Sequence, residues 1–208
     1  MKKTRFHKKN LEEERKRSMK FKSLKKVHEG KFIARYDVTY ETSDGKDKVY
    51  EMISRDRNIQ TYADLQNLKD GEKVDAVVLI MHDESGEKIL LNREFRMAAG
   101  DFVYNFPAGL IEPGEDPAEA ARRELWEETG LTLLHIDDWM YESYSAVGFS
   151  NEKNVCAVGT AGGQFAPSTS AEEEIEAGWY TKEETAELLK KYRFAARTQA
   201  YCYLWSRE

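Results

Sequence analysis

The stretch GLIEPGEDPAEAARRELWEETGL, residues 109–131, decides the fold of this chain of 208 residues. Its second half predicts a helix over residues 117–129. Asp116 is a favourable N-cap residue, and Glu119 follows it by three positions, as in a capping box. Gly130 then supplies a residue at which helices commonly end, because glycine adopts the left-handed conformation without strain.

Three carboxylates share one side of this predicted helix, since Glu124 precedes Glu127 by three residues and Glu128 by four. Each like-charge pair at that spacing costs a helix about 0.2–0.5 kcal/mol. Arg123 offsets part of the repulsion. A hard divalent cation such as Mg²⁺ or Mn²⁺ offsets more, because these ions take carboxylate oxygens as ligands. A solvated, Glu-rich surface helix is the alternative interpretation.

The loop before the helix favours the metal site. The residues follow a fixed spacing: Gly109, five residues, Glu115, seven residues, Arg123-Glu124-Leu125, one residue, Glu127-Glu128, one residue, Gly130-Leu131. This pattern resembles the Nudix box at every defined position, which is a far more specific signal than a short glycine motif. The resemblance implies an α/β protein, the Nudix α/β/α sandwich with a mixed sheet.

Composition limits the function classes. The formal net charge is −6, although residues 1–26 carry 12 Lys and Arg against 3 Glu. We interpret these residues as a solvated basic arm, with contact to RNA or an acidic partner as the alternative. The acidic body of the chain argues against a general nucleic-acid binder. The longest apolar run, residues 76–81, is far shorter than the roughly 20 residues that span a membrane. Cys156 and Cys202 lack metal-binding spacing, so we expect reduced thiols in a cytoplasmic protein.

Strand and turn signals divide the chain into parts. Short strands at residues 32–38 and 49–54, around a turn at 43–46, indicate a small antiparallel β unit over residues 27–72. Residues 73–208 form the main domain. It is expected to contain strands at residues 74–82, 88–93, 103–106, 139–145, 155–160 and 175–180, and helices at residues 182–191 and 195–206.

Beyond the box, the chain is similar to the nucleoside-diphosphate-sugar branch of the Nudix hydrolases, especially the ADP-ribose pyrophosphatases. The resemblance implies that the N-terminal β unit mediates a homodimer. The segment from Tyr50 to Arg55 matches a Tyr/Trp-Glu-x-x-x-Arg pattern, which implies that both residues bind substrate and that Tyr50 stacks on the nucleobase. An aromatic residue in the interface core is the alternative for Tyr50. Val147 stands where ADP-ribose hydrolases typically have proline, which weakens the case for ADP-ribose as the substrate but leaves the expected chemistry unchanged.

The same resemblance assigns roles around the box. It implies that the metal ligands are the Ala108 carbonyl, Glu124 and Glu128. Glu127 would assist them, and Glu115 and Arg123 would orient the cluster.

Two arginines and three more glutamates complete the candidate site. Arg93 and Arg96 lie on a predicted strand that approaches the helix, where guanidinium groups suit a phosphorylated substrate; ion pairing with the acidic body is the alternative. Glu152 is a candidate base or outer metal ligand, with turn formation as an equal interpretation. Glu172 and Glu173 share the role of catalytic glutamate that the resemblance places in an acidic loop, with a solvated loop as the alternative.

These features predict a pyrophosphohydrolase that depends on Mg²⁺, with Mn²⁺ as a possible substitute. The expected substrate is a small nucleoside diphosphate derivative, ADP-ribose or a related nucleotide sugar, which yields a nucleoside monophosphate and a sugar phosphate. GDP-mannose-like sugars and dinucleotide cofactors are the other candidates. A Nudix-fold nucleotide sensor or regulator is the alternative outside the enzyme class.

Overall fold

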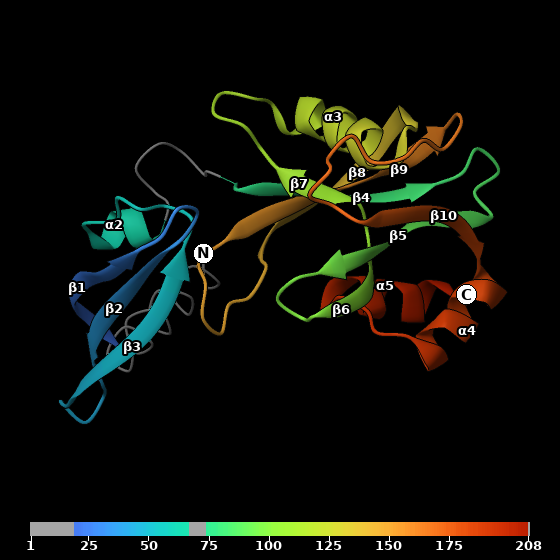
Figure 1. Ribbon diagram of the computed structural model, residues 1–208. Coiled ribbons are helices and arrows are strands. Elements are labelled where there is room, and N and C mark those ends of the chain that lie inside the picture. Colours follow the sequence, from blue (N-terminus) through green and yellow to red (C-terminus); the bar gives the residue numbers. More distant parts are fainter. Residues whose placement is uncertain (1–18, 67–73, 208) are drawn as a thin grey trace, which may run out of the picture. The chain divides into compact units, whose positions relative to one another are not determined.

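The computed structural model describes residues 19–66 and 74–207 (Figure 1). The chain divides into two compact units. The first unit comprises the residues up to Lys73 together with Tyr144–Glu152, and the second comprises Val74–Ser143 and Lys153–Glu208. None of the helices in the described ranges has the length and apolar character needed to cross a membrane.

An antiparallel sheet in the order β1-β2-β3 makes up most of the first unit. Its strands are Lys20–Glu29 (β1), Ala34–Glu41 (β2) and Asp47–Ser54 (β3), followed by the short helix Tyr62–Leu65 (α2). The turn expected at residues 43–46 joins β2 to β3, and Gly45 adopts a positive φ of 79° there. Ala34, Tyr36, Val38, Met52 and Ile59 form the core of this unit.

Strand β1 corrects one expected boundary. Residues 1–18 of the expected basic arm lie outside the described residues, but the arm was expected to continue to residue 26, and β1 already pairs with β2 from Lys20. The basic composition hid this strand, because Lys20 points to solvent and pairs with Glu41. Phe21 and Leu24 pack against the core of the unit and hold the strand in place.

A mixed sheet in the order β10-β5-β4-β9-β8 forms the centre of the second unit, and β6 and β7 add to β5 and β4. The strands are Ala76–His82 (β4), Lys88–Arg96 (β5), Asp101–Asn105 (β6), Ala108–Leu110 (β7), Thr132–Tyr144 (β8), Lys153–Gly162 (β9) and Ile175–Thr181 (β10). Strand β4 runs parallel to β9 and antiparallel to β5 and β7, so the sheet is mixed, as expected.

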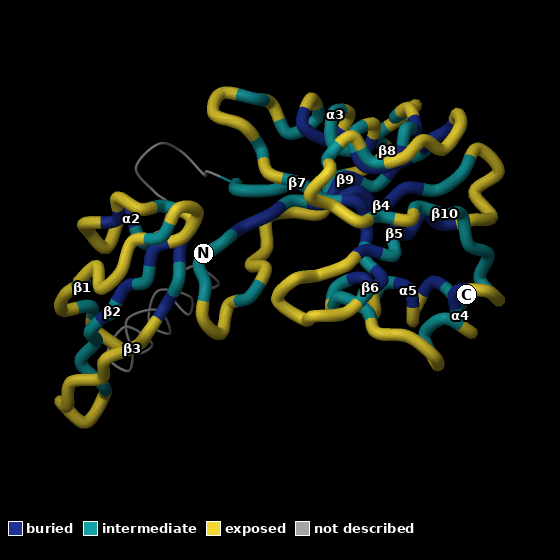
Figure 2. The backbone as a smooth tube through the Cα atoms, in the orientation of Figure 1, coloured by how far each residue is buried: buried dark blue, intermediate teal, exposed yellow. Residues whose placement is uncertain are grey.

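Helices cover both faces of this sheet (Figure 1). They are Pro117–Thr129 (α3), Lys182–Lys191 (α4) and Ala196–Trp205 (α5). Alternate residues of β4 supply two cores: Val77 and Leu79 pack with α3, whereas Val78 and Ile80 pack in the core that α5 closes with Trp205. The residues between the layers are the most buried part of the unit (Figure 2). The expected α/β/α sandwich is therefore confirmed.

Two strands of the second unit differ most from what the sequence predicted. Strand β8 begins at Thr132, although a strand was expected only from Trp139. It is a terminal strand of the sheet, and apolar residues such as Leu134 and Tyr141 are exposed on it. Buried apolar and exposed polar residues therefore do not alternate along β8, so the period-2 signal of a strand is weak. Strand β7 was not expected, because three residues that include Gly109 carry little strand signal.

Candidate active site

Helix α3 begins and ends where the sequence predicted. The Asp116 carboxylate accepts a hydrogen bond from the Ala118 amide at 2.8 Å, and Glu119 completes the capping box. Gly130 adopts the left-handed conformation with φ of 77° and donates its amide hydrogen to the Trp126 carbonyl. These caps fix which residues of the helix face the sheet.

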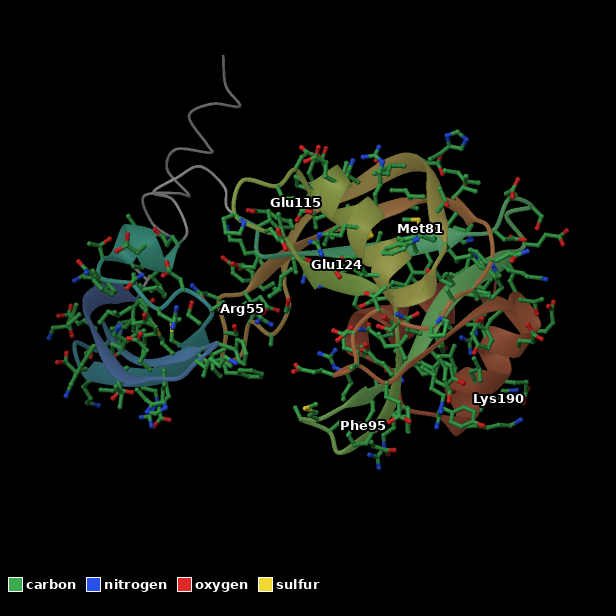
Figure 3. All side chains as sticks on the ribbon, turned by 45° about the horizontal axis from the view of Figure 1, so that its top comes forward. Arg55, Met81, Phe95, Glu115, Glu124 and Lys190 are labelled. Atoms are coloured by element: carbon green, nitrogen blue, oxygen red, sulfur yellow. The ribbon has the colours of Figure 1, made fainter. Side chains whose placement is uncertain are left out.

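Arg123 holds three of the carboxylates together. Its guanidinium donates to both oxygens of Glu115 at 2.9 Å, to Glu124 at 2.7 Å and to Glu127 at 3.1 Å. A further hydrogen bond of 2.9 Å reaches the carbonyl of Leu110. The hydrogen bonds from Arg123 lower the pKa of Glu115 to about 2. Figure 3 shows Glu115 and Glu124 on the α3 side of the second unit.

The Glu124 carboxylate packs against Gly109 in β7, on the side where a Cβ would project. An added Cβ on Gly109 would lie 1.9 Å from Glu124 Cδ, so only glycine leaves room for this carboxylate. Burial raises the pKa of Glu124 above its usual value, although the hydrogen bond from Arg123 acts in the opposite direction.

Glu128 lies deepest in the cluster, with 6% of its surface exposed. Its Oε2 accepts hydrogen bonds from Asn92 Nδ2 at 2.8 Å and from the Ala108 amide at 3.3 Å. Burial raises the pKa of Glu128 well above its usual value, and the charges of Glu94, Glu124 and Glu173 raise it further. A negative charge at this position therefore needs a positive partner.

Strand β5 brings two side chains that sequence analysis did not nominate, Asn92 and Glu94. Glu94 is buried, accepts a hydrogen bond from Asn105 at 3.1 Å and forms an ion pair of 3.2 Å with Arg96. The signal for Glu94 in the sequence was its spacing of two residues from Asn92, because side chains two positions apart on a strand lie on the same face.

Arg93 and Arg96 do not act as a pair. Arg96 joins Glu94, whereas Arg93 forms an ion pair of 2.8 Å with Glu176 and places its Cζ 3.8 Å from the centre of the Phe102 ring. Side chains at odd and even positions of a strand point to opposite faces, so Arg93 points away from the carboxylates. These contacts are those of the alternative interpretation, ion pairing with the acidic body, and a role for Arg93 in substrate binding stays a prediction.

The acidic loop, residues 163–174 between β9 and β10, is anchored to the C-terminal end of α3. The amides of Ala166 and Thr169 donate to the carbonyls of Thr129 and Glu127, each at 2.9 Å. Of the two nominated glutamates, it is Glu173 whose charge raises the pKa of both Glu124 and Glu128. The electrostatic coupling therefore favours Glu173 over Glu172 as the carboxylate that faces the cluster.

The remaining nominated residues lie in the first unit. Arg55 pairs with Glu152, and the Tyr50 hydroxyl donates to the Gly148 carbonyl. Tyr50 also lines a cavity of about 260 Å³. Other residues of its wall are Tyr40, Tyr62, Tyr144, Val147 and Phe149. Glu152 therefore already has a cationic partner, and Tyr50 is available to a ring that enters this cavity.

The donor set of the second unit fits a hard divalent cation. Within residues 19–66 and 74–207, no three acidic, histidine or cysteine side chains are already arranged around one point, and Arg123 donates hydrogen bonds to Glu124 and Glu127. However, the buried Glu128 is surrounded by other negative charges, a repulsion that a cation relieves. Asn92 Oδ1 is a further buried oxygen without a hydrogen-bond partner among the described residues. Oxygen-rich, carboxylate-dominated sites of this kind suit Mg²⁺ or Mn²⁺.

Comparison with known proteins shows the family of the chain. Residues 72–201 match the model of the NUDIX domain. The chain belongs to this family. Proteins with a NUDIX domain generally use divalent cations, in line with the donor set around Glu124 and Glu128.

Two curated relatives and one solved structure resemble this NUDIX protein. Nudix hydrolase 19, chloroplastic, of Arabidopsis thaliana is 34% identical over 130 residues, which cover 60% of this chain and 28% of the relative. The ADP-sugar pyrophosphatase of Mus musculus is 32% identical over 104 residues, which cover 50% of this chain and 44% of the relative. The chain thus spans less than half the length of either relative. A crystal structure of an ADP compounds hydrolase shares the fold, with a TM-score of 0.65, 19% identity and coverage of 91% of this chain and 92% of that chain.

Proposed function

We propose that the protein hydrolyses the pyrophosphate bond of an ADP-sugar, such as ADP-ribose, or of a related nucleotide sugar, and releases a nucleoside monophosphate and a sugar phosphate. The observation that carries this proposal is the arrangement of Glu124 on Gly109 beside the buried Glu128, in a chain with a NUDIX domain. The name of the mouse relative, an ADP-sugar pyrophosphatase, supports the substrate class.

Each residue of the candidate site in the second unit has a distinct role in this proposal. Glu124 and Glu128 hold the divalent cation, with Glu127 and the Ala108 carbonyl beside them. Such a cation, when bound, activates water and neutralises charge on the pyrophosphate. Arg123 and Glu115 keep Glu124 in place through the hydrogen bonds described above.

Two more groups act on the substrate itself. Arg96 is exposed over most of its side chain and lies on the face of the carboxylates. Its Nη1 pairs with Glu94, and the guanidinium has further N–H groups that can bind a phosphate oxygen. Glu173 accepts the proton of the water that attacks phosphorus, because its loop is anchored beside the cluster. The bridging oxygen of the pyrophosphate then leaves with the second phosphate.

Recognition of the nucleobase belongs to the first unit in this proposal. The cavity beside Tyr50 has aromatic walls that suit a flat ring, with polar groups from Gln66, Ser150 and Asn151 at its edge. Val147 contributes to the wall where ADP-ribose hydrolases typically have proline. The expected homodimer remains a prediction that light scattering after size-exclusion chromatography would test.

A substrate panel tests the proposal. Purified protein is incubated with ADP-ribose, other nucleotide sugars, GDP-mannose and NAD, each with Mg²⁺ or Mn²⁺, and both phosphorylated products are quantified. Removal of divalent cations by EDTA is expected to abolish turnover. Tight binding of ADP-ribose without any product would favour the nucleotide sensor instead.

Glu128→Gln is the decisive variant. Because a metal ion contributes several kcal/mol of charge stabilisation, we expect turnover to fall by about 100-fold or more. The matched control is Glu119→Gln on the same helix, whose side chain serves the capping box, and it should hydrolyse at the wild-type rate. Near-normal turnover by Glu128→Gln would contradict the mechanism.

A further inference from the structure

Asn92 is a polar residue in a strand that is otherwise built for a core. The three residues before it, Ile89 to Leu91, are fully buried and apolar, and Asn92 itself has no exposed surface. Leu90 packs in the core that α3 covers, so Asn92, two positions along the strand, faces α3 as well. Its amide meets the carboxylate of Glu128 on that helix.

Both described hydrogen bonds to Glu128 end on the same oxygen. Asn92 Nδ2 lies 2.8 Å from Oε2, and the Ala108 amide nitrogen lies 3.3 Å from it. No donor from the described residues reaches Oε1. The described residues therefore hold the carboxylate through Oε2 and give Oε1 no hydrogen bond.

Asn92 is an unfavourable choice for the fold alone. Its Oδ1 is buried without a hydrogen-bond partner among the described residues. A leucine, whose side chain is branched like that of asparagine and has the same number of heavy atoms, would continue the apolar strand without leaving a buried polar atom unpaired. Asparagine is therefore the costlier residue for packing. The contact with Glu128 is what asparagine provides and leucine cannot.

We propose that Asn92 is a positioning residue that orients Glu128 for a divalent cation. The inference rests on the proposed function only in so far as Glu128 binds that cation. Outer groups that orient a metal ligand contribute to metal affinity, and their loss typically weakens binding by about 10–100-fold. Asn92 thereby connects strand β5 to the carboxylates of α3.

The test measures Mn²⁺ binding without substrate, by electron paramagnetic resonance of free Mn²⁺ and by calorimetry. Asn92→Leu is expected to bind Mn²⁺ about 10–100-fold more weakly than the wild type. The matched control is Thr185→Val on α4, which also removes a buried side-chain oxygen without a described partner, but in a residue of the other helical layer. This control should keep the wild-type Mn²⁺ affinity.

Urea unfolding without metal accompanies each titration, so that folding is judged separately from binding. If Asn92→Leu does not fold, Asn92→Ser replaces it, because a serine hydroxyl is too short to reach Glu128 but remains compatible with a strand. Wild-type Mn²⁺ affinity in a folded Asn92 variant would overturn the inference, even if the variant were less stable. Wild-type protein that binds Mn²⁺ but hydrolyses no compound of the panel would overturn the proposed function alone, and the Asn92 variants would still be judged by affinity.

Discussion

The carboxylate of Glu124 occupies the space that a side chain at position 109 would need: a Cβ added to Gly109 would lie 2.1 Å from each carboxylate oxygen of Glu124. Gly109 does not have a positive φ, in contrast to Gly114 and Gly130. The requirement for glycine at position 109 is therefore steric and comes from the site, whereas Gly130 is required by the end of the helix.

Gly109→Ala is expected to inactivate the protein while leaving it folded. The three atoms nearest to the added methyl group are the carboxylate atoms of Glu124, at the far end of a flexible side chain, so the clash is relieved when that side chain moves and its hydrogen bond with Arg123 breaks. The displaced carboxylate then loses its place beside Glu128, so we expect turnover to fall by about 100-fold, as for loss of a metal ligand. Steady-state kinetics and thermal unfolding measure the two effects.

Gly148→Ala is the control for this substitution. An added Cβ at Gly148 has no atom within 4 Å, and the residue lies in the first unit. Mn²⁺ affinity, which Gly109→Ala should lower because Glu124 is displaced, should therefore stay at the wild-type value in Gly148→Ala. Full activity of Gly109→Ala would show that Glu124 does not need the position described here.

Glu115→Gln is expected to lower stability in a pH-dependent way. The folded pKa of Glu115, about 2, lies below the usual value of 4.5, so the ionised side chain stabilises the fold above pH 4.5. This contribution falls as the pH decreases from 4.5 and is lost near pH 2. Because hydrogen bonds between charged groups contribute about 1.5–3 kcal/mol, the variant should lose that amount of unfolding free energy at pH 7.

Urea denaturation at several pH values between 3 and 7 checks this expectation. The stability difference between wild type and Glu115→Gln should shrink at acid pH. Glu112→Gln, a change at an exposed residue of the same loop, should show no such difference. A constant difference across the range would mean that Glu115 does not stabilise the fold through its charge.

Arg96→Gln and Arg93→Gln are expected to have different effects. Arg96 lies on the face of the carboxylates, so its loss should raise KM for the nucleotide sugar by about 10–100-fold, the equivalent of one charged hydrogen bond. Arg93→Gln breaks the contacts with Glu176 and Phe102 and should leave KM unchanged. Equal effects of both variants on KM would contradict the assignment of faces.

Glu173→Gln and Glu172→Gln test the choice of base. General-base catalysis typically contributes about 10²–10⁴-fold, so Glu173→Gln should lower kcat within that range and leave Mn²⁺ binding intact. Glu172→Gln is the matched neighbour and should retain its kcat. The reverse result would move the catalytic role to Glu172, and two active variants would point to a base outside the acidic loop.

Local signals made much of the fold and the core of the site predictable. Helix α3 could be placed to the residue because its caps are sequence neighbours, and α4 begins after Thr181 for the same reason. Strands β1 and β8 were less predictable, since lysines and exposed apolar residues mask the alternation that marks a strand.

The sequence by itself determined that Glu124, Glu127 and Glu128 share one side of a capped helix, because helical geometry follows from spacing. Only the tertiary structure decided which residues meet that helix from elsewhere. It brought Asn92 to Glu128 and separated Arg96 from Arg93. The physical reason is that these relationships depend on which strand lies beneath α3 and on which face of that strand a side chain points, and neither is encoded in neighbouring residues.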